Sequence, residues 1–216
     1  MVVDTFMLER WIRLVAIASG LLAICLPLLR LWRSRDTRIG RSSGNQVSWT
    51  RWSGVVILTL LYISIGVLLW RPIPLKISPA MRMSLIISGL VVYLPGIALY
   101  LWGFQSLGSL FSVSTIESAQ LYQQHQIVES GPYSFVRHPM YLGVMLAAIG
   151  ALLIFHTWAM VLFTPSAFIV ILRARREEQL LAREFGASWA EYCRHVPPWM
   201  PRFLRGKIKT DEQVYR

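Results

Sequence analysis

Residues 140–172 read MYLGVMLAAIGALLIFHTWAMVLFTPSAFIVIL, and this stretch decides the fold class of the chain. It contains no Asp, Glu, Lys or Arg, and its 33 residues exceed the roughly 20 that one membrane-spanning helix needs. His156, Thr157 and Trp158 interrupt it near the middle. We therefore expect a tight helical hairpin, in which one helix ends near Phe155 and the next begins at about Trp158.

Three more apolar stretches precede this hairpin, at residues 11–32, 52–70 and 84–102. The second and third carry no charged residue, and at a rise of about 1.5 Å per residue each stretch can cross a membrane. Tryptophans mark the ends, as they do at membrane interfaces: Trp11, Trp32, Trp52, Trp70 and Trp102. The first stretch lacks a small-residue cleavage site, so we expect a retained anchor. The sequence predicts an all-α integral membrane protein with five transmembrane helices.

The basic residues are distributed unequally over this topology. Of the 22 Lys and Arg residues, 17 lie on one side of the membrane: six in the connection between spans one and two, one in the connection between spans three and four, and ten after span five. The opposite side has five: Arg10, Arg13, Arg71, Lys76 and Arg82. The positive-inside rule then places the N-terminus outside and the C-terminus in the cytoplasm. This excess accounts for the net charge of +11 without a nucleic-acid partner. The small bundle suits a bacterial inner membrane, and the endoplasmic reticulum stays open as an alternative.

The sequence contains no motif for a metal centre or a nucleotide fold. Cys25 lies in the first span and Cys193 in the C-terminal tail, so the two cannot pair. No Cys/His cluster has metal-ligand spacing, and no Gly-x-Gly-x-x-Gly fingerprint or phosphate-binding loop is present. We expect no metal site and no Rossmann domain.

The chain divides by composition into two regions. Residues 1–102 form three N-terminal transmembrane helices with a basic cytoplasmic loop at 33–51. Residues 103–216 form the catalytic region, which comprises a loop at 103–139, the helical hairpin at 140–176 and a C-terminal tail. A loop of that length with no helix of its own tends to be functional or disordered, and its aromatic and branched residues argue against disorder.

Arg137 and His138 stand immediately before the fourth span, and Pro139 suits the first turn of its helix. Exposed backbone N–H groups and the positive helix end would make this position an anion site. The alternative is that Arg137 and His138 only anchor the helix among lipid headgroups.

A second charged cluster, Arg173-Ala174-Arg175-Arg176-Glu177-Glu178, follows the fifth span. Taken alone, such a run is a solvated helix end with ion pairs. A hairpin, however, brings the start of the fourth span beside the end of the fifth. We expect residues 137–141 and 173–178 to face each other, and ionisable residues gathered at a membrane are candidates for function.

The tail is expected to form one more short helix. Gly186 ends the preceding helix, and Ser188-Trp189-Ala190-Glu191 has the pattern of a capping box. Pro197-Pro198-Trp199 then stops regular structure. The short helix either covers the site or lies on the lipid surface.

Several of these motifs, in this order, resemble the isoprenylcysteine carboxyl methyltransferases, a family related to phospholipid N-methyltransferases. The resemblance covers about residues 107–201, and the first three spans match only in hydropathy. Trp189 departs from it, because the family more often has tyrosine there. It is carried by Gly131-Pro132-Tyr133, Arg137-His138-Pro139-Met140-Tyr141, Glu177-Glu178, Phe185-Gly186, Glu191-Tyr192 and Val196-Pro197.

The resemblance implies S-adenosylmethionine as the methyl donor. Its implied binding residues are His125, Val128, Gly131, Tyr133, Arg137, His138, Pro139, Tyr141, Glu177 and Glu178. Arg173 and Glu177 are the implied catalytic residues, with Arg173 facing the substrate. The first choice of acceptor is a lipophilic molecule with an isoprenylcysteine-like carboxylate.

Other functions stay open at this point. A phospholipid or small-molecule N- or S-methyltransferase would use the same cofactor. A membrane reductase would depend on a nicotinamide, and a membrane scaffold would have no activity. Transport is disfavoured, because among Asp, Glu, Lys, Arg and His only His156 lies near the middle of a stretch expected to span, and it lies at the hairpin tip.

Overall fold

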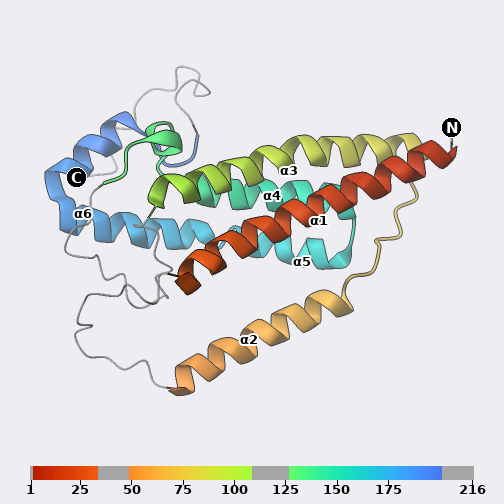
Figure 1. The fold of residues 1–216 in the computed structure, drawn as a ribbon, viewed down its shortest axis with the longest axis horizontal. Coiled ribbons are helices and arrows are strands. Elements are labelled where there is room, and N and C mark those ends of the chain that lie inside the picture. The colour runs from red at the N-terminus through yellow and green to blue at the C-terminus, as the bar shows by residue number, and fades with distance from the viewer. Residues whose placement is uncertain (1, 34–48, 109–126, 201–216) are drawn as a thin grey trace. The chain divides into compact units, whose positions relative to one another are not determined.

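The computed structural model describes residues 2–33, 49–108 and 127–200, and these are helical almost throughout (Figure 1). Within them there is no β-strand, only an isolated bridge between Pro72 and Thr157. The predicted all-α class is therefore confirmed over the described ranges. The elements are α1 (Val2–Arg33), α2 (Trp49–Leu68), α3 (Pro79–Leu107), the 3-10 turn η3 (Gly131–Ser134), α4 (Pro139–Phe155), α5 (Trp158–Ala167) and α6 (Val170–His195).

Three described helical stretches are long and apolar enough to span a membrane: Phe6–Pro27, Pro79–Leu107 and Trp158–His195. Two shorter apolar helices accompany them, Ile57–Leu68 and Pro139–Phe155. At 38 residues, Trp158–His195 is longer than the roughly 20 that a bilayer needs, and its charged residues begin at Arg173. Its uncharged part is residues 158–172. The five-span topology stays a prediction.

The described helices belong to two compact units, and the first consists of residues 1–98 and 143–169. Its core is formed by Ile12 and Ala16 of α1, Ile86 and Tyr93 of α3, and Ile154 of α4. The Tyr93 hydroxyl donates to the Ala16 carbonyl at 2.7 Å, and α1 and α3 lie side by side (Figure 1). This bond satisfies a buried hydroxyl that would otherwise oppose packing.

Glycines allow α3 and α4 to approach closely within this unit. A Cβ atom at Gly89 would lie 2.8 Å from the Gly150 carbonyl oxygen, and one at Gly150 would lie 2.6 Å from the Tyr93 nitrogen. At Gly96 the nearest atom would be the Ala147 nitrogen, at 2.7 Å. Such backbone contact is a common way to pack helices in a membrane, where apolar side chains gain little by leaving lipid.

His156 and Thr157 form the turn between α4 and α5. His156 has a positive φ of 50°, and Thr157 caps α5 by accepting a hydrogen bond from the Met160 N–H. The Ile73 N–H donates to the His156 carbonyl at 2.8 Å, which fixes the turn to the segment after α2. The predicted helix ends at Phe155 and Trp158 are confirmed.

Two predicted helix boundaries were wrong. The helix expected to run on from Trp158 is divided at residues 168–169, where the N–H groups of Phe168 and Ile169 bond three residues back, to Pro165 and Ser166. This tightened turn ends α5. The helix before the predicted loop continues to Leu107, beyond residue 102, and Gly103 within it lies close to Met140, where a Cβ would be 2.7 Å from Met140 Cγ.

The second unit consists of residues 99–142 and 170–216. Its hydrophobic core is formed largely by the C-terminal part of the described chain. Trp189, Tyr192 and Val196 are buried there. Gly186, with φ 49° and ψ −115°, interrupts α6 where the sequence predicts a helix end. We call residues 187–199 the C-terminal arm. Because these three side chains of the arm are buried in protein, the packing favours covering of the site over binding to the lipid surface.

Candidate active site

A buried ion-pair cluster lies at the start of α4. Glu178 Oε1 of α6 is 2.9 Å from His138 Nε2 and 3.3 Å from the Arg137 guanidinium. The Arg137 and His138 side chains are only 7% and 6% exposed. The two charged clusters that the sequence predicts to face each other therefore meet through Glu178.

Glu178 is held ionised by its two partners. Burial of its carboxyl works against the charge, but the hydrogen bond with His138 and the charge of Arg137 outweigh it. The pKa of Glu178 consequently lies below the usual glutamate value. The cluster thus carries a carboxylate at neutral pH and a guanidinium beside it.

A second, more exposed group surrounds the Tyr141 hydroxyl. It donates to Glu177 Oε2 at 2.9 Å, and Arg173 also interacts with it. Arg173 and Glu177 are both exposed. The two residues implied as catalytic therefore meet at one hydroxyl and are open to a ligand.

Arg137 contacts the C-terminal arm on several sides. Its Nη1 donates to Cys193 Sγ, and its guanidinium carbon lies 5.8 Å from the centroid of the Trp189 ring. Its Nε is buried without a hydrogen-bond partner in the described part of the chain. A buried, unpaired donor on a cation is costly, so this guanidinium has capacity to bind an anion.

The backbone just before α4 pairs with the C-terminal arm. The Arg137 N–H donates to the Pro197 carbonyl at 2.9 Å, and the His138 N–H donates to the Pro198 carbonyl at 3.2 Å. These two N–H groups are therefore occupied by the arm. The first-turn N–H groups of α4 itself belong to Met140 and Tyr141, since Pro139 has none, so the anion site expected at this helix end stays a prediction. The arm returns to pair with residues 137 and 138, which no local pattern around residue 137 indicates.

The His138 ring is held between two aromatic rings. Tyr141 stacks on it at 5.7 Å between centroids, and Trp199 of the arm lies at 5.3 Å. Sequence reasoning missed Trp199 and Cys193 as neighbours of the cluster. The one signal for Trp199 was its place directly after Pro197-Pro198. That pattern indicates that the chain turns there, but not which residues Trp199 then contacts.

The segment before the cluster contains three of the implied cofactor residues. Val128 is half-buried, and Gly131 has φ 63° with Ser106 Oγ 2.5 Å from where its Cβ would be. Tyr133 is buried, which raises the pKa of its phenol, and its carbonyl accepts from the Tyr192 hydroxyl at 2.7 Å. Gly131 therefore has a steric reason to be glycine. Pro139 is buried at the first position of α4, and His125 lies outside the described residues.

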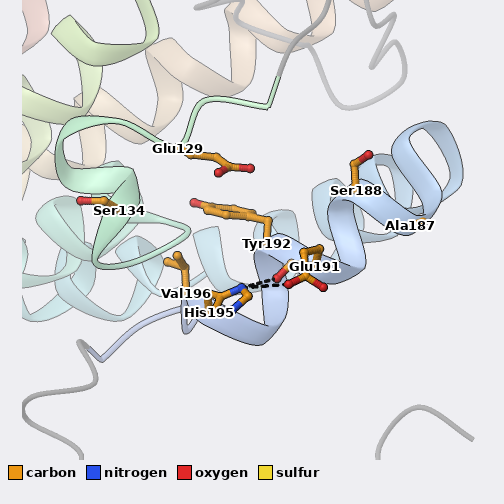
Figure 2. Close-up of a pocket in the computed structure, with 8 residues that line it drawn as sticks. All are labelled: Glu129, Ser134, Ala187, Ser188, Glu191, Tyr192, His195 and Val196. Carbon is orange, nitrogen blue, oxygen red and sulfur yellow. Dashed lines mark hydrogen bonds and ion pairs between the residues drawn. The ribbon is translucent and has the colours of Figure 1, made fainter.

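A cavity of about 700 Å³ lies beside the arm (Figure 2), but it is not at the ion-pair cluster. At about 100° per residue, Ser188, Glu191 and His195 share one side of the helical arm, whereas Trp189 and Cys193 share another. The cavity opens on the first side and Arg137 lies on the second. It is lined by Glu129, Ser134, Ala187, Ser188, Glu191, Tyr192, His195 and Val196.

Apolar helices of spanning length, with buried ionised side chains at one helix end, define an integral membrane protein with a polar site. Residues 88–183 match the model of the isoprenylcysteine carboxyl methyltransferase (ICMT) family. The resemblance seen in the sequence is thus confirmed over that part of the chain. It includes Arg137, His138, Tyr141, Arg173, Glu177 and Glu178.

Three relatives differ in name and in extent of similarity. The protein-S-isoprenylcysteine O-methyltransferase of Xenopus laevis is 31% identical over 122 residues, which are 56% of this chain and 41% of the relative. The methanethiol S-methyltransferase 2 of Bradyrhizobium diazoefficiens is 29% identical over 171 residues, 74% of this chain and 63% of the relative. The Delta(14)-sterol reductase TM7SF2 of Mus musculus is 30% identical over 92 residues, which are 40% of this chain and 21% of the relative.

The matched part spans less than two thirds of each of these relatives. Two of the three names describe methyltransferases, which supports the methyltransferase expectation.

Proposed function

We propose that this protein is an S-adenosylmethionine-dependent methyltransferase that acts on a lipophilic acceptor at the membrane. The observation that supports it most is the buried Arg137–Glu178–His138 cluster, adjoining the exposed Arg173–Tyr141–Glu177 group within the family match. The cluster pairs ionised groups of both signs, as a zwitterionic cofactor requires.

The residues fit the charges of this cofactor. Its carboxylate needs N–H donors, and Arg137 has a buried N–H without a partner in the described residues. Its ammonium and sulfonium need acceptors, which Glu177 and Glu178 supply. When bound, S-adenosylmethionine supplies an electrophilic methyl group.

The preferred acceptor is the carboxylate of an isoprenylcysteine-like molecule. A carboxylate is already ionised near pH 7, so no residue has to remove a proton. The work of the site is then to hold the acceptor oxygen in line with the methyl group. Arg173, exposed beside Tyr141, is placed to bind such a carboxylate.

A second candidate is S-methylation of a small thiol. The relative named methanethiol S-methyltransferase 2 covers 74% of this chain, more than the other two compared here. A thiol has to lose its proton before attack, and the imidazole of His138, paired with Glu178, is a group able to accept one.

The proposal includes a five-span topology with the N-terminus outside and the site in the cytoplasm, in a bacterial inner membrane by preference. The basic residues that follow spans one and five support this orientation.

The test begins with calorimetric binding of S-adenosylmethionine and S-adenosylhomocysteine to the purified protein in nanodiscs. We expect micromolar binding, followed by methyl transfer to an S-prenylated cysteine with a free carboxylate. Transfer to methanethiol instead would select the second candidate. Absence of binding in a folded sample, together with nicotinamide-dependent reduction of a sterol, would overturn the methyltransferase proposal.

A further inference from the structure

We propose that Cys193 and Trp189 of the C-terminal arm are positioning residues, which hold the Arg137 guanidinium in place without neutralising it, so that it can bind the anionic end of the cofactor. This inference rests on the proposed function. It assigns a role to the arm, which lies outside residues 88–183, the range that matches the family.

Three contacts join Arg137 to the arm, and none of them removes its charge. The thiol of Cys193 is a weak acceptor for Nη1, and the face of the Trp189 indole attracts a cation without forming an ion pair. The third contact, to the Pro197 carbonyl, uses the backbone N–H. The arm therefore packs around the guanidinium and leaves its charge in place.

Glu178 is shared between Arg137 and His138 rather than paired with Arg137 alone. One oxygen, Oε1, serves both neighbours, and it is closer to His138 than to Arg137, at 2.9 against 3.3 Å. Burial raises the pKa of the Cys193 thiol, although the Arg137 charge opposes this, so the thiol is not a second anion at neutral pH. With Nε also unpaired, Arg137 has capacity for one further anionic partner.

The arm does not depend on Cys193 for its own position. The Tyr192 hydroxyl donates to the Tyr133 carbonyl at 2.7 Å, and Tyr192 and Val196 are buried in the core of this unit. The backbone bonds from Arg137 and His138 to the two prolines fix its end. A substitution at residue 193 can therefore change the environment of the guanidinium while the arm stays in place.

The experiment compares substitutions at residue 193 in the full chain in nanodiscs. Cys193→Ser keeps a small neutral acceptor, and we expect its S-adenosylhomocysteine affinity within about threefold of wild type. Cys193→Asp adds a carboxylate that pairs with Arg137, and we expect a loss of at least about tenfold. Ser188→Asp, on the other side of the arm, is the matched control and should change affinity by less than about twofold.

A second ligand separates positioning from structural damage. We would measure 5′-methylthioadenosine, which has the nucleoside and thioether but no carboxylate. If Cys193→Asp loses S-adenosylhomocysteine affinity while binding of 5′-methylthioadenosine is unchanged, Arg137 is the group affected. Equal losses for both ligands, or wild-type affinity for S-adenosylhomocysteine in Cys193→Asp, overturn the proposal.

Should Cys193→Asp fail to fold, Trp189 provides the same comparison. Trp189→Phe keeps a ring beneath the guanidinium, whereas Trp189→Leu removes it, and we expect a loss of about threefold or more only in the second. Equal affinities in the two variants would contradict the role of Trp189. If wild-type protein itself binds no S-adenosylhomocysteine, the proposed function fails and this inference with it; if only the residue 189 and 193 variants are neutral, this inference fails alone.

Discussion

Glu178 is the residue on which the candidate site depends, because it is the anion of a cluster that also buries Arg137 and His138. Removal of one partner of a buried ion pair destabilises the fold by more than the pair stabilises it, because the other charge is left buried without a partner. The same charges are the ones that a zwitterionic cofactor would meet. Stability and ligand binding are thus linked in the same few side chains.

We predict that Glu178→Ala and Arg137→Ala each reduce S-adenosylhomocysteine affinity by at least about a hundredfold, because each removes a charged group that the proposal pairs with a charge of the cofactor. The loss of a buried partner also destabilises the fold, by about 3–5 kcal/mol. Calorimetry in nanodiscs measures the affinity, and circular dichroism checks that the variants are folded. Glu191→Ala removes a carboxylate from an exposed pair with Arg194 and serves as the control. Wild-type affinity in the folded Glu178 and Arg137 variants would contradict the assignment.

Arg173 offers a way to separate the acceptor from the cofactor. It is exposed next to Tyr141 rather than buried in the Glu178 cluster. We predict that Arg173→Ala raises the KM for a prenylated carboxylate acceptor by about tenfold or more, through loss of a charge-assisted bond, while S-adenosylhomocysteine affinity changes by less than about threefold. An unchanged KM, or a large loss of S-adenosylhomocysteine affinity, would move Arg173 out of this role. Steady-state kinetics and calorimetry on one preparation provide both numbers.

At the residue scale, the sequence predicted the partners in the cluster but not its surroundings. The predicted hairpin would place residues 137–141 and 173–178 on the same membrane surface, so their pairing could be expected from hydropathy alone. Cys193 and Trp199 reach the site because the arm folds back after Gly186, and the direction of that return depends on a glycine backbone angle. Local patterns do not encode such an angle.

At the scale of elements, the fold depends on how closely α3 and α4 approach. The glycines at 89, 96 and 150 lie where each Cβ would meet backbone atoms of the other helix. Hydropathy predicted both helices, since their apolar length is apparent from sequence. It missed the end of α5 at Ala167, because the three-residue hydrogen bonds that end this helix do not change its apolar composition.

We predict that Gly150→Val destabilises the protein by about 1–3 kcal/mol or more, because its Cβ would lie 2.6 Å from the Tyr93 nitrogen and neither backbone can move freely. A lower midpoint of thermal unfolding in detergent would show this. Ala98→Val enlarges an exposed position of α3 by a similar volume and should leave the midpoint almost unchanged. Equal midpoints for wild type and Gly150→Val would mean that α3 and α4 do not approach so closely.

At the scale of the whole molecule, topology and charge place the chemistry. The predicted topology puts Arg137 and residues 173–178 on the side of the membrane that carries most of the basic residues. The orientation of the chain therefore decides which compartment supplies the cofactor. S-adenosylmethionine is a charged, water-soluble molecule, and the proposed site works only if it opens to the side that contains it.

Cysteine labelling tests this orientation directly. In a Cys25→Ser, Cys193→Ser background, Ser78→Cys lies between α2 and α3 on the predicted outer side, and Ser188→Cys lies in the exposed part of the arm on the predicted inner side. The positive-inside rule sets 17 basic residues against five, so we predict that a membrane-impermeant maleimide labels Ser78→Cys in intact cells and Ser188→Cys only after lysis. The reverse pattern would place the Arg137–Glu178 cluster outside. Cytoplasmic S-adenosylmethionine could not then reach it, and the methyltransferase proposal would fail on topology even if purified protein bound the cofactor.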